Sequence, residues 1–190
     1  MLNRVGSLVV TDASHLRVVL DETIRVGSLR YFESTNRFAD AVQAALVMTL
    51  PSTLKAVIGS PDDSESLVAL AWRSPTEALL LTDSVSRFEQ IEAVSETHQD
   101  GCFVDQTHGL CVLRAGGEQL LDLLSRLGGN DLFPLLGDSK RGRLAQVPVL
   151  TLKVQPKEIL LVVERTYVEQ LMDWIQETAV DLHLVTVRPQ

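Results

Sequence analysis

The chain has 190 residues, enough for one well-filled core or for two small subdomains that share one. Its hydrophobic fraction of 45% and charged fraction of 22% are those of an ordinary globular protein. Its formal net charge of −8 argues against a nucleic-acid binder, because binding to phosphates requires a surplus of lysine and arginine. The chain lacks an apolar stretch of the roughly 20 residues that a membrane span needs, and it lacks a signal-peptide pattern. Its two cysteines favour a cytoplasmic protein with reduced thiols.

The first half of the chain alternates between strand-like and helical patterns. The first 15 residues show no clear periodicity, and we interpret them as an N-terminal arm. Apolar and β-branched residues then indicate strands at residues 16–20 and 25–32. From Thr35 the apolar residues recur at helical spacing until Pro51 closes the segment. The next predicted elements are a loop at residues 60–66, a hairpin, a helix and a strand at 101–106. The helix carries Val85, Phe88, Ile91 and Val94 on one face.

The second half repeats this order. A strand is predicted at residues 109–115, and a helix follows until Gly128-Gly129-Asn130 ends it by supplying positive-φ positions. Residues 131–144 are predicted to form a long connection to a second hairpin. The next helix begins with Thr166 and Glu169, whose spacing is that of a capping box. A final strand is predicted at residues 182–187.

One pattern occurs twice, about eighty residues apart, at residues 66–84 and 149–165. Each copy has an apolar run, a proline, a glutamate two residues later, and a second apolar run that leads into a helix. The prolines are Pro75 and Pro156, and proline favours the first central position of a tight turn. Each copy therefore predicts a hairpin that opens into a helix.

The order of elements predicts an α+β fold made of two ferredoxin-like βαββαβ halves. The halves span about residues 28–106 and 109–187, within a single domain of residues 1–190 that begins with an N-terminal extension. Two such halves would form adjoining antiparallel sheets, with helices packed on one side of each. This duplication predicts architecture and no chemistry.

The sequence contains no pattern that predicts catalysis or metal binding. His98, Cys102, His108 and Cys111 lie close together in sequence, but their spacing matches no common zinc-site pattern. The G-x-S-x-G motif of a serine nucleophile is absent. Gly116-Gly117 lies between a strand and a helix without the spacing of a nucleotide-binding loop, so a tight turn is the better interpretation. We therefore predict no catalytic residues and no metal ligands.

Two segments have alternative interpretations. Residues 139–143 contain Lys140, Arg141 and Arg143, which could meet a phosphate or an acidic partner, although we favour a solvated loop. Residues 164–167, Glu-Arg-Thr-Tyr, lie where a strand ends and a helix begins, a common place for ligand contacts. A helix start also attracts acidic residues without any function, so both interpretations of this segment stay open.

Two stretches, residues 103–129 and 159–175, resemble the aminomethyltransferase (glycine-cleavage T-protein) superfamily. Within that superfamily the chain is most similar to the gamma subunit family of heterotetrameric sarcosine oxidase. That family has about this length, an L-x-x-x-L-P segment as at residues 46–51, and a hairpin similar to residues 72–81. It also has a V-D-x-S/T strand, as at residues 104–107, and a closing helix with the aromatic-x-x-x-L-x-x-W-I pattern seen here.

The resemblance implies a folate-binding-type fold like that of T-protein, and a role as a non-catalytic gamma-type subunit of a sarcosine-oxidase-like flavoenzyme. Such a complex converts sarcosine to glycine, passes the one-carbon unit to tetrahydrofolate and forms peroxide. In this interpretation the chain binds other subunits and carries no cofactor. The alternative that the resemblance implies is a stand-alone folate-binding, aminomethyltransferase-like protein, with Asp105, Glu164, Arg165 and Tyr167 as candidates for holding tetrahydrofolate.

Overall fold

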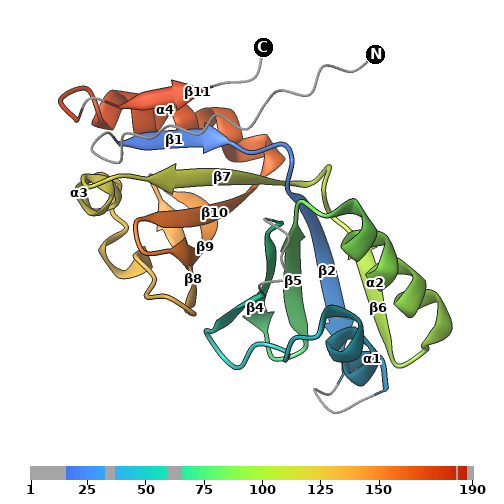
Figure 1. Cartoon of the computed structure of the whole chain (residues 1–190). Coiled ribbons are helices and arrows are strands. Elements are labelled where there is room, and N and C mark those ends of the chain that lie inside the picture. Colours follow the sequence, from blue (N-terminus) through green and yellow to red (C-terminus); the bar gives the residue numbers. More distant parts are fainter. Residues whose placement is uncertain (1–15, 33–36, 60–65, 183, 188–190) are drawn as a thin grey trace, which may run out of the picture.

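The computed structural model describes residues 16–32, 37–59, 66–182 and 184–187 of the chain (Figure 1). The predicted N-terminal arm and most of the predicted loop at 60–66 lie outside the described residues. The described residues form a mixed α+β fold with a five-stranded sheet, a six-stranded sheet and four α-helices.

The first half of the chain forms the five-stranded sheet, in the order β3-β4-β5-β2-β6, together with two helices. Its elements are β2 (Arg25–Tyr31), α1 (Arg37–Leu46), β3 (Ala56–Gly59), β4 (Val68–Ser74), β5 (Glu77–Thr82), α2 (Val85–Thr97) and β6 (Gly101–Asp105). Neighbouring strands in this sheet are all antiparallel.

The second half forms the six-stranded sheet, in the order β11-β1-β7-β10-β9-β8. Its elements are β7 (Leu110–Gly116), α3 (Leu120–Arg126), the 3-10 turn η1 (Asn130–Leu132), β8 (Ser139–Leu144), β9 (Val147–Gln155), β10 (Glu158–Glu164), the 3-10 turn η2 (Arg165–Tyr167), α4 (Val168–Thr178) and β11 (Val185–Val187). The sheet also contains β1 (Arg17–Leu20), from the start of the chain.

The two halves repeat one topology, which confirms the predicted duplicated ferredoxin-like fold. The order β6-β2-β5-β4-β3 in the first sheet corresponds to β11-β7-β10-β9-β8 in the second, once β1 is set aside. Each half therefore has one more strand than predicted, β3 in the first and β8 in the second. The extra strands occupy equivalent positions at the outer edge of their sheets.

The prediction of a long connection at residues 131–144 was wrong, because β8 occupies its end. β8 and β9 form a hairpin whose two turn residues, Ala145 and Gln146, have φ values of 47° and 69°. Such a turn normally carries Asn-Gly or another glycine-containing pair. Neither residue of this turn is a glycine or an asparagine, so the usual sequence signal for a hairpin is missing.

β1 is the predicted strand of the N-terminal extension, and it joins the sheet of the other half. It lies between β7, to which it is antiparallel, and β11, to which it is parallel. The chain then crosses into the first sheet, as the blue ribbon shows in Figure 1. The first and second halves are therefore connected at this crossing as well as at the β6–β7 connection.

The two sheets face each other and the helices cover their outer faces (Figure 1). On β10, Leu160 and Val162 point between the sheets, while Leu161 and Val163 point toward α3 and α4. Both faces of the central strands are buried, which explains their nearly continuous apolar runs. The cluster between the sheets consists of Ile24, Val26, Ala56, Ala69, Ala71, Leu79, Leu81, Val112, Leu150, Leu152, Leu160 and Val162.

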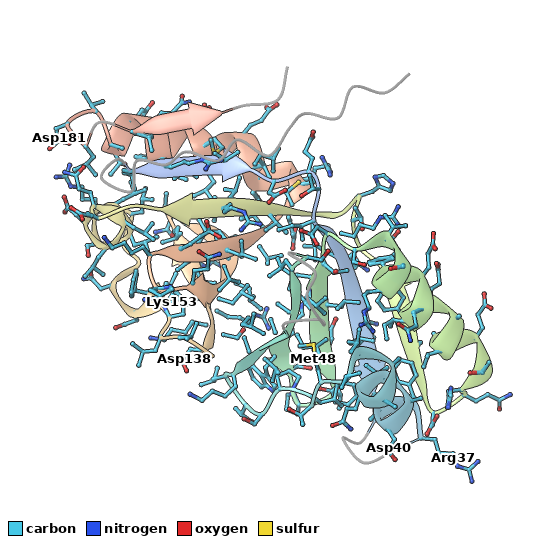
Figure 2. The ribbon with its side chains drawn as sticks, in the orientation of Figure 1. Arg37, Asp40, Met48, Asp138, Lys153 and Asp181 are labelled. Carbon is cyan, nitrogen blue, oxygen red and sulfur yellow. The ribbon has the colours of Figure 1, made fainter. Side chains whose placement is uncertain are left out.

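Polar contacts also join the two halves. Lys55 Nζ, just before β3, lies 2.6 Å from Asp138 Oδ1, just before β8, and Figure 2 shows Asp138 on the side of the second half that faces the first. This hydrogen bond is the main cause that holds the pKa of Asp138 below its usual range. Farther along the sheets, the half-buried Arg114 of β7 forms ion pairs with Asp21 and Glu158.

Both predicted hairpins are confirmed, whereas the predicted capping box was wrong. The turns place Pro75 and Pro156 directly after β4 and β9, as expected from the fixed φ of proline. The helix α4, however, begins only at Val168, after the 3-10 turn η2, and no side chain caps its N-terminus. Thr166 lies inside that turn, so it cannot serve as the capping residue.

Candidate functional site

A cavity of about 380 Å³ lies at one end of the space between the two sheets. Its apolar part continues the cluster between the sheets, and its polar part consists of three arginines and one glutamate. The lining residues come from six strands of both halves: Arg73, Leu79, Leu110, Arg141, Gly142, Arg143, Pro148, Val149, Leu150, Val162 and Glu164. The cavity therefore exists only because the two halves are packed together.

The alternation of β8 directs Arg141 and Arg143 toward the cavity. Ser139, on the same face of this strand, donates its hydroxyl proton to the carbonyl oxygen of Trp72 in the first sheet, over 3.1 Å. Side chains two residues apart point to the same face of a strand. Lys140 points to the opposite face and does not line the cavity. The strand thus places the two arginines of the predicted basic segment, both exposed, on the face that lines the cavity, and Lys140 on the opposite face.

Two of the three arginines have no carboxylate partner among the described residues. Arg73 forms an ion pair with Glu77, at 2.9 Å. Arg141 Nη1 donates to the carbonyl oxygen of Arg73, at 3.1 Å, and Arg143 Nη1 donates to the carbonyl oxygen of Gln146, at 3.3 Å. A guanidinium that bonds only to carbonyl oxygens keeps its positive charge and further donors for an anion. The cavity therefore has a surplus of positive charge within a chain of net negative charge.

Glu164 lies on the other side of the cavity, at the end of β10. It pairs with Leu110 of β7, and its carboxylate has no hydrogen-bond or ion-pair partner in the described part of the chain. Of the four residues that we predicted as ligand contacts, this is the one that lines the cavity.

Arg165 instead holds the connection between the halves. Its Nε donates to the carbonyl oxygen of His108, at 2.9 Å, and its Nη2 to that of Thr107, at 3.2 Å. Asp105 ends β6 directly before this connection, and its Oδ1 accepts the backbone N–H of Thr107, at 2.8 Å. Arg165 and Asp105 are thus brought together by the residues between β6 and β7. Tyr167 ends the turn η2 with 38% of its side chain exposed, outside the lining of the cavity.

The arginines of the cavity were not predicted as site residues. The basic run at 139–143 was a usable signal for Arg141 and Arg143, but we interpreted it as a solvated loop. Arg73 follows an apolar strand in sequence and gave no signal at all. The arrangement can bind an anionic group at the arginines and a cationic or hydrogen-bond-donating group at Glu164.

The two cysteines and two histidines that lie close together in sequence form no metal centre: among the described residues, no three metal-binding side chains converge. Cys102 is exposed and Cys111 is buried. Burial raises the pKa of the Cys111 thiol, which disfavours the thiolate.

Among the described helices, none has the length and apolar character needed to cross a membrane.

No protein-family model matches the chain, and no curated protein matches its sequence. Among solved structures, the chain is similar to a chain of the heterotetrameric sarcosine oxidase from Corynebacterium sp. U-96, with a TM-score of 0.73 and 17% sequence identity. That match covers 94% of this chain and 91% of the other. The glycine cleavage system aminomethyltransferase T from Bartonella henselae matches with a TM-score of 0.69 and 10% identity, over 92% of this chain and 48% of that one.

At these identities the two matches show a common fold. The chain spans almost the full length of the sarcosine oxidase chain and about half of the aminomethyltransferase. The chain has the fold of a sarcosine oxidase subunit, built from duplicated ferredoxin-like halves.

Proposed function

We propose that this protein is a non-catalytic, gamma-type subunit of a heterotetrameric sarcosine-oxidase-like flavoenzyme. The observation that carries the proposal is the similarity to a chain of sarcosine oxidase over 94% of this chain and 91% of the other, with a TM-score of 0.73. Because the similarity covers nearly the whole of both chains, it matches a complete subunit of that complex. The sequence resemblance to the gamma subunit family supports the same subunit.

An exposed apolar surface supports a role in subunit contact. Leu54, Leu135 and Leu136 have exposures of 52%, 68% and 65%. Their loops are adjacent, because the backbone N–H of Ser139 donates to the carbonyl oxygen of Leu54, at 3.0 Å. Large exposed apolar side chains that cluster are typical of protein interfaces.

Purification of the tagged chain from its native host tests the proposal. We expect a species much heavier than the 20.9 kDa chain, with the visible absorption of a flavin and with peroxide formation from N-methyl amino acids. The double variant Leu135→Asp/Leu136→Asp should lose the complex, while Val180→Asp, at a site 83% exposed on the α4 side of the second half, should retain it. A colourless species of 20.9 kDa under gentle conditions would contradict the proposal.

A stand-alone folate-binding protein is the second candidate function. The observation that favours it is the cavity between the halves, with room for a small molecule and a carboxylate, Glu164, directed at it. Such a carboxylate can accept hydrogen bonds from the amino and ring N–H groups of a pterin.

Titration of the isolated chain with tetrahydrofolate tests this candidate. Glu164→Gln should weaken binding by about fivefold, since Glu164 is exposed and water screens the charge-assisted hydrogen bond that it would make. Glu169→Gln, an exposed position on α4, is the matched control and should have no effect. Arg165→Ala is a poorer probe, because Arg165 also holds the β6–β7 connection. If wild-type protein does not bind tetrahydrofolate, the second candidate is excluded.

A further inference from the structure

We propose that the cavity between the sheets is a binding site for an amino dicarboxylic acid, that is, a small organic molecule with two carboxylates and an amine. Arg141 and Arg143 would bind the carboxylates, and Glu164 the amine. This inference goes beyond both candidate functions, since it needs neither a partner subunit nor folate.

The charges of the cavity match such a ligand. Arg73 is paired with Glu77, whereas Arg141 and Arg143 donate only to backbone carbonyl oxygens in the described part of the chain. The charges without an oppositely charged partner are therefore those of Arg141 and Arg143 on β8 and that of Glu164, while Arg73 shares the carboxylate of Glu77 with Arg30. A ligand with two carboxylates and one ammonium group has the complementary set, and charge-assisted hydrogen bonds to each group are the strong kind.

The spacing of these groups follows from the strands that carry them. Arg141 and Arg143 are two residues apart on one face of β8, so their Cα atoms are about 7 Å apart. Arg143 pairs with Pro148 of β9, and continuing the register of β9 and β10 by one residue places Glu164 on the other side of Pro148. Two strand spacings of about 4.8 Å then separate Glu164 from Arg143, giving about 10 Å between their Cα atoms. Side chains that reach inward from these positions leave room for a ligand of a few carbon atoms.

The floor of the cavity favours an organic acid over an inorganic anion. Leu79, Leu110, Leu150 and Val162 line it, and these side chains contact carbon better than the oxygen atoms of phosphate. The volume of about 380 Å³ is also at the lower end of the range for small-molecule sites.

Arginines that point inward on an edge strand also have an explanation without a ligand. β8 is an edge strand, and inward-pointing charges protect such edges from pairing with other chains. In that case Arg141→Gln and Arg143→Gln would promote self-association without affecting the binding of any small molecule. The two explanations therefore predict different measurements.

Isothermal titration calorimetry of the full chain with L-glutamate, glutarate and inorganic phosphate tests the inference. We expect saturable binding of L-glutamate and glutarate at one site and no saturable binding of phosphate. Arg141→Gln and Arg143→Gln should each raise the dissociation constant for both acids by about fivefold, because both arginines are exposed and water screens the lost charge-assisted hydrogen bond. Lys140→Gln is the matched control, with the same change of charge on the other face of the same strand, and should bind as the wild type does.

Glu164→Gln separates recognition of the amine from recognition of the carboxylates. This variant should weaken L-glutamate and leave glutarate, which lacks the amine, at least as tightly bound as in the wild type. Circular dichroism of each variant shows whether it is folded. Absence of saturable binding of both acids to the wild type, equal loss in Lys140→Gln, or binding only of an acidic peptide would overturn the inference. None of these results depends on complex formation or on folate.

Discussion

The substitution Leu160→Ala tests whether the two halves unfold as one domain, as we propose from the duplicated pattern. Leu160 on β10 is fully buried and belongs to the apolar cluster that both sheets share. Replacing a buried leucine with alanine removes contacts and leaves a space that the surroundings fill only partly, at a cost of about 3 kcal/mol or more. With a urea dependence near 3 kcal/mol per molar, expected at the upper end for a chain of this length, the midpoint of unfolding should fall by about 1 M.

The two tryptophans of the chain allow each half to be observed separately. Trp72 is in β4 of the first half and Trp174 is in α4 of the second half. Variants with a single tryptophan, Trp72→Phe and Trp174→Phe, therefore report on one half each by fluorescence. In a single domain, Leu160→Ala should lower the urea midpoint equally for both reporters, although the residue belongs to the second half.

Val180→Ala is the control, because its side chain is 83% exposed and its replacement should change stability by less than about 0.5 kcal/mol. Two different midpoints, with only the Trp174 signal shifted by Leu160→Ala, would refute the reasoning. The halves would then be separate folding units, and the cluster between the sheets would contribute little to their joint stability.

Further predictions concern the polar contacts and the β8–β9 turn. Arg114→Met should lower the free energy of unfolding at neutral pH by about 2 kcal/mol in urea titrations, because the two carboxylate partners of Arg114 lose their counter-ion. The loss is smaller than the roughly 3–5 kcal/mol of a fully buried pair, because the Arg114 side chain is 26% exposed. Burial is the main cause that raises the pKa of Asp83, so the folded protein binds this proton more readily than the unfolded chain and loses stability as pH rises above about 4. Asp83→Asn should therefore raise Tm at pH 7, with no gain at about pH 3, where the carboxyl is protonated in both states. Ala145→Asn/Gln146→Gly should raise stability by roughly 1 kcal/mol in urea titrations, because these residues suit the positive φ values of the turn.

The sequence predicted the repeated part of the fold because its signals are local. A proline in each hairpin and apolar residues at helical spacing depend only on near neighbours, and the duplication supported each assignment with a second copy. The strands β3 and β8 were missed for different reasons. β3 reads Ala-Val-Ile-Gly, which is apolar but has only four residues. β8 reads Ser-Lys-Arg-Gly-Arg-Leu, in which only the last residue is apolar. As an edge strand β8 needs fewer apolar residues because one of its sides has no neighbour, so its pattern resembles that of a loop.

The error at the start of α4 and the position of β1 in the sheet both depend on distant parts of the chain. A capping box is defined by residue types at fixed spacing, but the chain at Thr166 is still in a 3-10 turn, whose geometry depends on the bonds of Arg165 to the β6–β7 connection. The strand β1 was predicted at nearly its observed position, whereas its place between β7 and β11 depends on residues about 95 and 168 positions away in the chain. Neither tertiary contact leaves a pattern in the nearby sequence.

The candidate site was predicted least well, because its residues are defined by the packing of the two sheets. The space between the sheets is filled by leucine, valine, isoleucine and alanine along most of its length, and arginines line it at one end. At this end Arg141 and Arg143 stay exposed and hydrated, so the segment is a local exception to the apolar pattern of the rest of the core. Exceptions of this kind occur at functional sites and at protected edges, and β8 could be either. The variants of Arg141 and Arg143 distinguish them: loss of ligand binding, with Lys140→Gln unaffected, indicates a site in the cavity, whereas self-association without loss of binding indicates a protected edge.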